Sequence, residues 1–127
     1  MASLTTTDGV EVDFSADAVA AVADHDADTG DAFACDWGPT AAVLKTLEGA
    51  VAFMARIDIA AKMAVLSRPD RSPVWISRKA VQSLQPPIPG DYPDDVRVVV
   101  ALVCLNQAVT QDMATAKALV NAKGANL

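Results

Sequence analysis

Residues 40–68 read TAAVLKTLEGAVAFMARIDIAAKMAVLSR, a stretch with no proline and a single glycine, Gly49. Its apolar residues recur at steps of three and four, the spacing that lines one face of an α-helix, at Val43, Leu47, Val51, Met54, Ile57, Ala61 and Val65. Gly38-Pro39 before the stretch and Pro69 after it are typical of helix ends. The pattern predicts one helix about 43 Å long. Such a helix crosses the whole molecule, bends at Gly49 or projects toward another copy.

A second apolar stripe with the same period begins after Pro93. Its members are Val98, Leu102, Leu105, Val109, Met113, Ala116 and Val120. Pro93 suits a first helical turn, and Gly124 suits the position just beyond a helix end. The valine-rich run 96–105 also fits a buried strand by propensity. The uninterrupted helical period favours a second long helix, with a strand over 96–105 left open as the alternative.

The N-terminal region predicts a small β-hairpin followed by a short helix. Asp8-Gly9 suits a tight turn, and residues 4–7 and 10–14 flank it as the two strands. Ser15 then has the character of an N-cap, opening a helix that reaches about Ala23.

The stretch VWISRKAVQSL at 74–84 echoes VDFSADAVAAV at 12–22. In both, an apolar triplet leads into serine, and Ala-Val follows at the same distance. The echo favours a short strand at 74–76 with Ser77 capping a helix through Leu84. The alternative is one longer helix capped by Ser72. A strand-then-helix unit used twice would produce the echo, and so would chance, because the identities are few.

These patterns predict a mainly α-helical fold: two long packed helices, short extra helices and a minor N-terminal hairpin. The chain has 127 residues, enough for a single domain over 1–127. Residues 1–3 are expected to be loose, and residues 24–37 to form a long acidic loop. Aromatic residues make up only 5% of the chain, and a core of small side chains favours closely packed helices.

The formal net charge of −6 argues against a nucleic-acid partner, which requires a basic face. The first 36 residues contain no lysine or arginine, whereas bases gather at Arg68, Arg71, Arg78 and Lys79. The two regions could meet within a subunit or between subunits, or the acidic one could be a solvated face. The sequence indicates neither a signal peptide nor a membrane span. With only two cysteines, it predicts a cytoplasmic protein with free thiols.

The acidic loop is the first candidate site. Asp24, Asp26 and Asp28 alternate as in a calcium-binding loop. Thr29 stands where the sharp turn of such a loop requires glycine, and Cys35 stands where it requires glutamate. Calcium is therefore an alternative to the simpler expectation of no cofactor, in which these aspartates cap helix ends and keep the loop solvated.

His25 and Cys35 add two further chemical alternatives in the same loop. With the neighbouring aspartates they could bind zinc, although neither a CxxC nor an HxxxH pair is present. Cys35 could also be a nucleophile activated by His25, the only histidine of the chain. Cys104, among valines and leucines, is expected to be an inert core thiol. The sequence favours a non-enzymatic protein, and an enzyme ranks behind a metal- or ligand-binding module centred on 24–36.

Two features of the predicted central helix concern burial and partners. Asp58 falls on its apolar face, where a pair with Lys62 is favoured over a catalytic or ligand-binding role. Ile59, Met63 and Leu66 form a second apolar side, which another part of the chain or another subunit could cover. The favoured function is an interaction or accessory protein that works as a homo-oligomer through these three residues, with no membrane partner.

Overall fold

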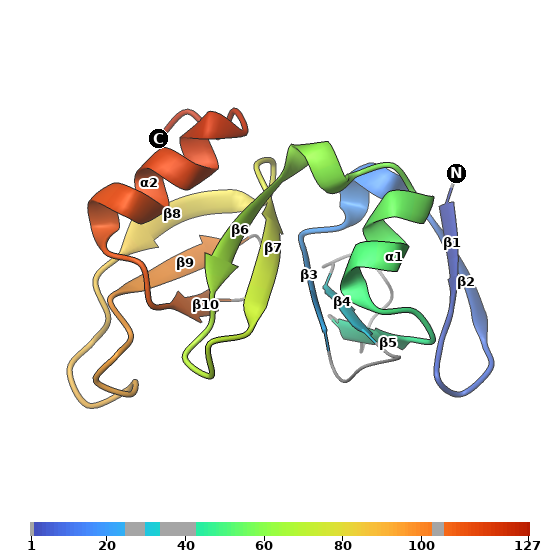
Figure 1. Cartoon of the computed structure of the whole chain (residues 1–127), viewed down its shortest axis with the longest axis horizontal. Helices are drawn as coiled ribbons and strands as arrows, with labels where there is room; N and C mark the ends of the chain where they lie inside the picture. Colours follow the sequence, from blue (N-terminus) through green and yellow to red (C-terminus); the bar gives the residue numbers. More distant parts are fainter. Residues whose placement is uncertain (1, 25–29, 34–42, 103–105) are drawn as a thin grey trace.

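The computed structural model describes residues 2–24, 30–33, 43–102 and 106–127 (Figure 1). In this part of the chain most regular structure is β: ten strands form three antiparallel sheets, accompanied by two α-helices. The helices are short, α1 (Ala50–Arg56) and α2 (Met113–Ala122). The prediction of a mainly α-helical fold with two long packed helices is therefore wrong.

The first half of the chain consists of a hairpin, three further strands and a helix. In chain order these are β1 (Ala2–Thr5), β2 (Glu11–Phe14), the 3-10 turn η1 (Ala16–Ala18), β3 (Ala21–Asp24), β4 (Gly30–Phe33), β5 (Val43–Thr46) and α1. Ala2 and Ser3, expected to be loose, belong to β1. Part of the expected acidic loop is strand β4.

The second half has its strands and its helix in the same order as the first half. Its elements are the 3-10 turn η2 (Ala60–Lys62), β6 (Met63–Ser67), β7 (Pro73–Ser77), β8 (Val81–Gln85), β9 (Val98–Leu102), β10 (Asn106–Val109) and α2. Here too a hairpin precedes three strands and a helix. The order of elements alone indicates an internal repeat.

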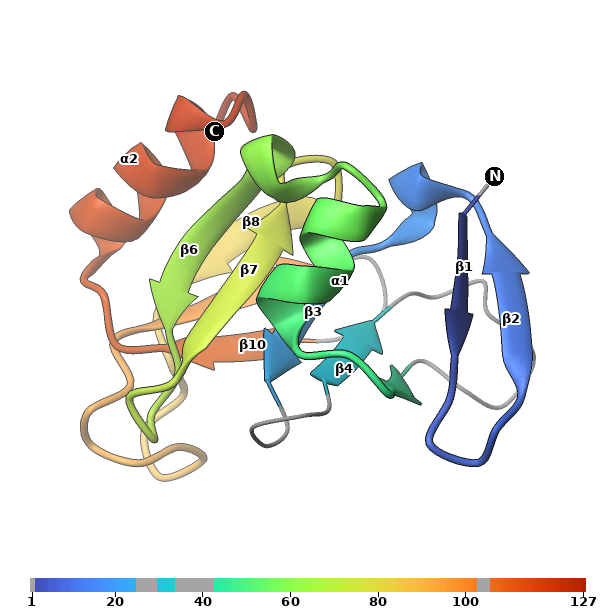
Figure 2. The ribbon, with the colours of Figure 1, turned by 45° about the vertical axis from the view of Figure 1, so that its right-hand side comes forward.

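The largest sheet joins the two halves. Its strand order is β5-β4-β3-β7-β6, so that β3 of the first half pairs with β7 of the second (Figure 2). The remaining strands form the hairpin β1-β2 and the three-stranded sheet β10-β9-β8. Figure 1 shows β8 and the β1-β2 hairpin at opposite ends of the molecule.

Two hydrophobic clusters lie on the two sides of this junction. Helix α1 packs near β3 and β4, and its Phe53 and Met54 are buried with Leu4 of β1. Helix α2 packs against β6 and β8, and buries Ala116 and Val120. Strand β3 contributes to both clusters, so the core continues across the repeat boundary.

The predicted helix over 40–68 is replaced by β5, α1, η2 and β6. Of its expected apolar stripe, Leu47, Val51 and Val65 are 53%, 63% and 47% exposed. Gly49 is the N-cap of α1, and Asp58 has a φ of 60°, which ends helical backbone. The stretch thus contains two interruptions, and its apolar residues are buried by short elements of different type.

The second long helix and the two short ones are also corrected. Residues 98–109 contain β9 and β10, and only α2 is helical beyond them. The strand alternative for the valine-rich run is confirmed for β9, as β-branched residues favour strands. After Ser77 a turn leads into β8 rather than a helix. The helix expected from Ser15 to Ala23 is the single turn η1 followed by β3.

Three local predictions are confirmed. The N-terminal hairpin forms around Gly9, whose φ is 83°. Residues 74–76 are strand, within β7. Gly124, with a φ of 100°, lies just beyond the end of α2.

The repeat is visible in the sequence once the structure supplies its boundaries. Residues 1–24 and 63–86 align without a gap at a shift of 62 positions. The identical pairs are Met1/Met63, Ala2/Ala64, Leu4/Leu66, Asp8/Asp70, Val12/Val74, Ser15/Ser77, Ala18/Ala80 and Val19/Val81. The echo between 12–22 and 74–84 is therefore part of a longer correspondence, although the second element of the unit is a turn and a strand.

The backbone repeats with the same shift. The β1-β2 hairpin pairs residue 2 with 14 and residue 5 with 11, and the β6-β7 hairpin pairs 64 with 76 and 67 with 73. The Thr6 N–H donates to the Val10 carbonyl at 2.8 Å. The equivalent Arg68 N–H donates to the Ser72 carbonyl at 2.9 Å. The turns after β2 and β7 are also closed alike, by residue 18 donating to residue 15 and by residue 80 donating to residue 77.

The helix ends repeat as well. The Ile59 N–H donates to the Met54 carbonyl at 3.0 Å, directly after Asp58 with its positive φ. The Ala125 N–H donates to the Val120 carbonyl at 3.2 Å, directly after Gly124. Both are Schellman-type ends. The two halves are thus copies of one unit of two plus three strands and a helix.

Candidate functional site: the inter-repeat groove and the open sheet edges

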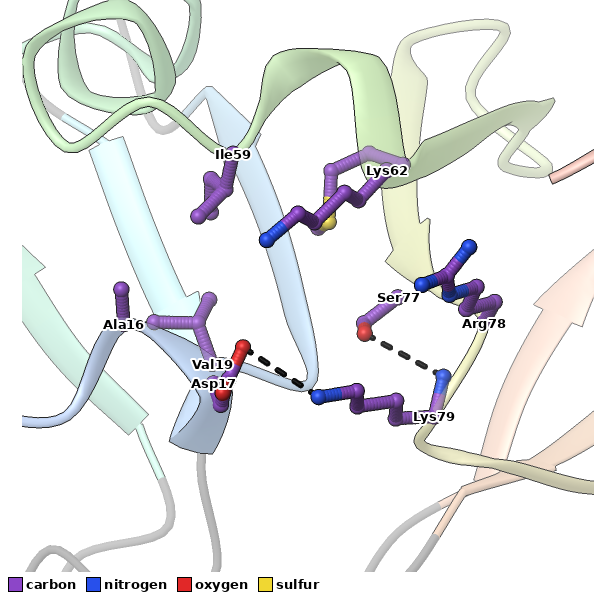
Figure 3. A pocket seen from close by; sticks show the side chains of 9 residues that line it. Ala16, Asp17, Val19, Ile59, Lys62, Ser77, Arg78 and Lys79 are labelled. Carbon is purple, nitrogen blue, oxygen red and sulfur yellow. Dashed lines mark hydrogen bonds and ion pairs between the residues drawn. The ribbon is translucent and has the colours of Figure 1, made fainter. Parts of the chain in front are cut away.

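A hollow in the described part of the chain lies beside the boundary between the repeats. It measures about 750 Å³ and is lined by Ala2, Ser3, Ser15, Ala16, Asp17, Arg56, Ile57, Asp58 and Lys62. The hairpin, the η1 turn and the connection between α1 and β6 supply these residues. A smaller hollow of about 10 Å³ adjoins it and reaches the turn after β7 (Figure 3). That volume is near one water molecule.

Two of the charged side chains that line the groove, Asp17 and Arg56, have charged partners. Lys79 Nζ lies 3.4 Å from Asp17 Oδ1, and both side chains are more than half exposed (Figure 3). Arg56 Nε donates to the Glu48 carboxylate at 2.9 Å, and its Nη2 donates to the Ser3 carbonyl at 2.6 Å. The hydrogen bond to Glu48, helped by its charge, raises the pKa of Arg56. These pairs are too exposed to contribute much stability.

The groove combines hydroxyl, carboxylate and cationic side chains. Its described lining includes the hydroxyls of Ser3, Ser15 and Ser77, the carboxylates of Asp17 and Asp58, lysine and arginine, but neither histidine nor cysteine. Ser77 Oγ accepts the Lys79 N–H at 3.3 Å, a turn contact (Figure 3). A serine nucleophile requires an adjacent base.

The three residues predicted to form an interface lie inside the chain. Ile59 and Met63 are 4% and 2% exposed and belong to the cluster around Phe53. Leu66 is 1% exposed and belongs to the cluster under α2. The predicted central helix does not form, and these three side chains are covered by other parts of the same chain.

Asp58 and Lys62 are brought to the same groove, but not by a helix. Helix α1 ends at Arg56, and Asp58 occupies the left-handed position that terminates it. Lys62 closes the following 3-10 turn. Both side chains line the groove, so Asp58 is a turn residue at its rim.

Of the predicted acidic site, Asp24 is described. Its Oδ1 accepts the N–H of Ala50 at 2.7 Å and thereby caps the first turn of α1. Asp26, Asp28, His25 and Cys35 lie outside the described residues, as does Cys104. Within the described ranges no three histidine, cysteine, aspartate or glutamate side chains are grouped to hold a metal. Calcium or zinc binding by this loop stays a prediction.

Two sheet edges are candidate interaction features that the sequence reading missed. Among the described strands, β8 pairs with β9 alone, and β2 pairs with β1 alone. An edge strand presents backbone donors and acceptors to a further strand. The echo at 12–22 and 74–84 contained the signal, because it marks β2 and β7 as equivalent. It could not show that β7 pairs with β3.

Comparison with known proteins gives no relative: no protein-family model, curated protein or solved structure matches this chain. No helix in the described part of the chain has both the length and the apolar composition required to cross a membrane.

Proposed function

We propose that this chain is a non-enzymatic interaction protein that acts as a homo-oligomer through strand pairing at its sheet edges. The observation that carries the proposal is the pair of edges at β2 and β8, at opposite ends of the molecule (Figure 1). Proteins commonly recognise one another by adding a strand to such an edge, where main-chain hydrogen bonds supply the affinity. Binding by this route needs no reactive side chain.

A cytoplasmic location belongs to the same proposal. Its support is the low cysteine content, two in 127 residues, since small proteins of oxidising compartments are often held by several disulfides.

The test of the proposed function is the mass of the protein in solution. Light scattering coupled to size exclusion should give a mass above the 13.2 kDa of the single chain, rising with concentration in the micromolar range. Salt should change the mass little, because backbone hydrogen bonds rather than surface charges make the contact. A mass of one chain at every concentration refutes the proposal.

A further inference from the structure

The strands of the described chain follow one another in a single series. It begins with β8-β9-β10, continues through β6-β7-β3-β4-β5 and ends with β1-β2. Where β10 meets β6, the Thr110 N–H, just after β10, donates to the Ser67 carbonyl of β6 at 2.9 Å. Where β5 meets β1, the Leu47 N–H, just after β5, donates to the Thr5 carbonyl of β1 at 3.1 Å. These two contacts between sheets lie at equivalent positions of the two repeats.

The two ends of this series match its centre. By the repeat, β2 is the equivalent of β7, and β8 is the equivalent of β3. Strands β3 and β7 pair with each other in the middle of the five-stranded sheet. The terminal strands are therefore the same two components, each with a single partner among the described strands, β1 for β2 and β9 for β8. They lie too far apart to pair with each other within one chain (Figure 1).

We propose that β8 of one copy pairs antiparallel with β2 of a second copy, reproducing the β3-β7 contact between chains. This inference rests on the proposed function and names its partner and its register. Within the chain, Val22 is opposite Trp75 and Ala23 is opposite Val74. The shift of 62 positions converts these pairs into Leu84 opposite Asp13 and Gln85 opposite Val12 of the second copy.

Burial provides an independent argument. Val19 and Val22, flanking or within β3, are 2% and 1% exposed, in a strand whose edge is covered by β7. Their equivalents Val81 and Leu84 are only partly buried, although they pack against the cluster under α2. Equivalent apolar side chains are thus buried in the first repeat and only partly buried in the second. A strand added to β8 would complete their burial.

A hydrogen bond next to the β3-β7 ladder predicts one further contact between the two copies. The Ser77 N–H donates to the Ala20 carbonyl at 2.8 Å and continues the β3-β7 ladder. The equivalent contact joins the Ser15 N–H of one copy to the Gln82 carbonyl of the other. Asp13 stands where the internal contact has Trp75, so the contact between copies is more polar than the internal one. We expect it to be weaker, because the partly buried ring of Trp75 adds apolar contact to the internal pairing, which Asp13 cannot provide.

The pairing is tested by disulfide capture between two different chains. Cys35 and Cys104 are replaced by serine in both; one chain then carries Asp13→Cys and the other Leu84→Cys. Directly opposed residues of antiparallel strands have Cα atoms about 4.5–5.5 Å apart, within the range of a disulfide. Mixing under mild oxidation should give a covalent dimer. The matched control replaces Leu84→Cys by Ser83→Cys, whose side chain points to the other face of the sheet, and should cross-link at least about tenfold less.

If Leu84→Cys unfolds the chain, as circular dichroism would show, Gln85→Cys with Val12→Cys tests the same register at the neighbouring pair and places the change in β8 at the exposed Gln85. Capture of either matched pair above its control supports the proposal. An oligomeric protein whose matched pairs cross-link no better than the control overturns this inference and leaves the proposed function intact. A protein that is monomeric by light scattering overturns both.

Discussion

Truncation of Leu66 is the sharpest test of the fold itself. Leu66 lies on β6, is 1% exposed and belongs to the cluster that α2 covers. Leu66→Ala leaves a cavity as well as losing apolar burial, and such changes cost about 2–5 kcal/mol. The neighbouring Val65 points to the other face and is 47% exposed, so Val65→Ala should cost less than about 1 kcal/mol. For a chain of this size, a loss of about 3 kcal/mol lowers the melting temperature by about 10–15 °C.

Scanning calorimetry and urea unfolding followed by far-ultraviolet circular dichroism would measure both variants. The chain should unfold in a single transition, which Leu66→Ala shifts to lower temperature and lower urea concentration. The two repeats should unfold together because the cluster around Leu66 includes Ala20, Ala21 and Ala23 from the first repeat. Equal losses for the Leu66 and Val65 variants would show that β6 does not present Leu66 to a core. Two transitions, only one of them shifted, would show that the repeats unfold independently and would contradict the shared sheet.

Three further changes test local geometry. Asp58→Gly should raise the free energy of unfolding by about 0.5 kcal/mol in urea titrations, because glycine adopts the positive φ of this position without a steric cost. Asp24→Ala removes the cap on Ala50 and should cost about 1 kcal/mol in the same assay; no loss would mean that α1 starts without this contact. Asp112 caps α2 by accepting the Thr115 N–H, which holds the pKa of its carboxyl below the usual value. Its stabilising effect is therefore present above the unfolded pKa of about 3.9 and is lost as the pH falls through the lower folded pKa. The melting-temperature gap between wild type and Asp112→Ala should shrink below about pH 4, and a gap unchanged at pH 2 would contradict the cap.

Local structure could be predicted from the sequence where a single residue determines the backbone conformation. Gly9 and Gly124 have the positive φ values that their turn and helix end require, and both positions were predicted. The strand at 74–76 was also predicted, from the echo between 12–22 and 74–84. At the two glycines the cause lies within a few residues of its effect.

The long-range arrangement was not readable in the same way. In an alanine- and valine-rich chain, apolar residues of consecutive short strands, turns and helices can fall three or four positions apart without forming one helix. The stretch 40–68 has this spacing, but it combines buried residues with the solvent-exposed Leu47 and Val51. The pairing of β3 with β7 joins residues some fifty positions apart, and no local period encodes it. The candidate edges follow from that pairing, so they could be found only once the structure showed it.

The connection between α1 and β6 has a consequence for how the two repeats find each other. It spans only residues 57–62, with the helix end and η2 inside it. So short a tether gives the β7 hairpin a high effective concentration at the edge of β3. Lengthening it with glycine and serine should weaken the internal pairing gradually, by about 0.6 kcal/mol for each doubling of a flexible tether. A long enough tether would let β7 of one chain compete for β3 of another, which is the condition for domain swapping.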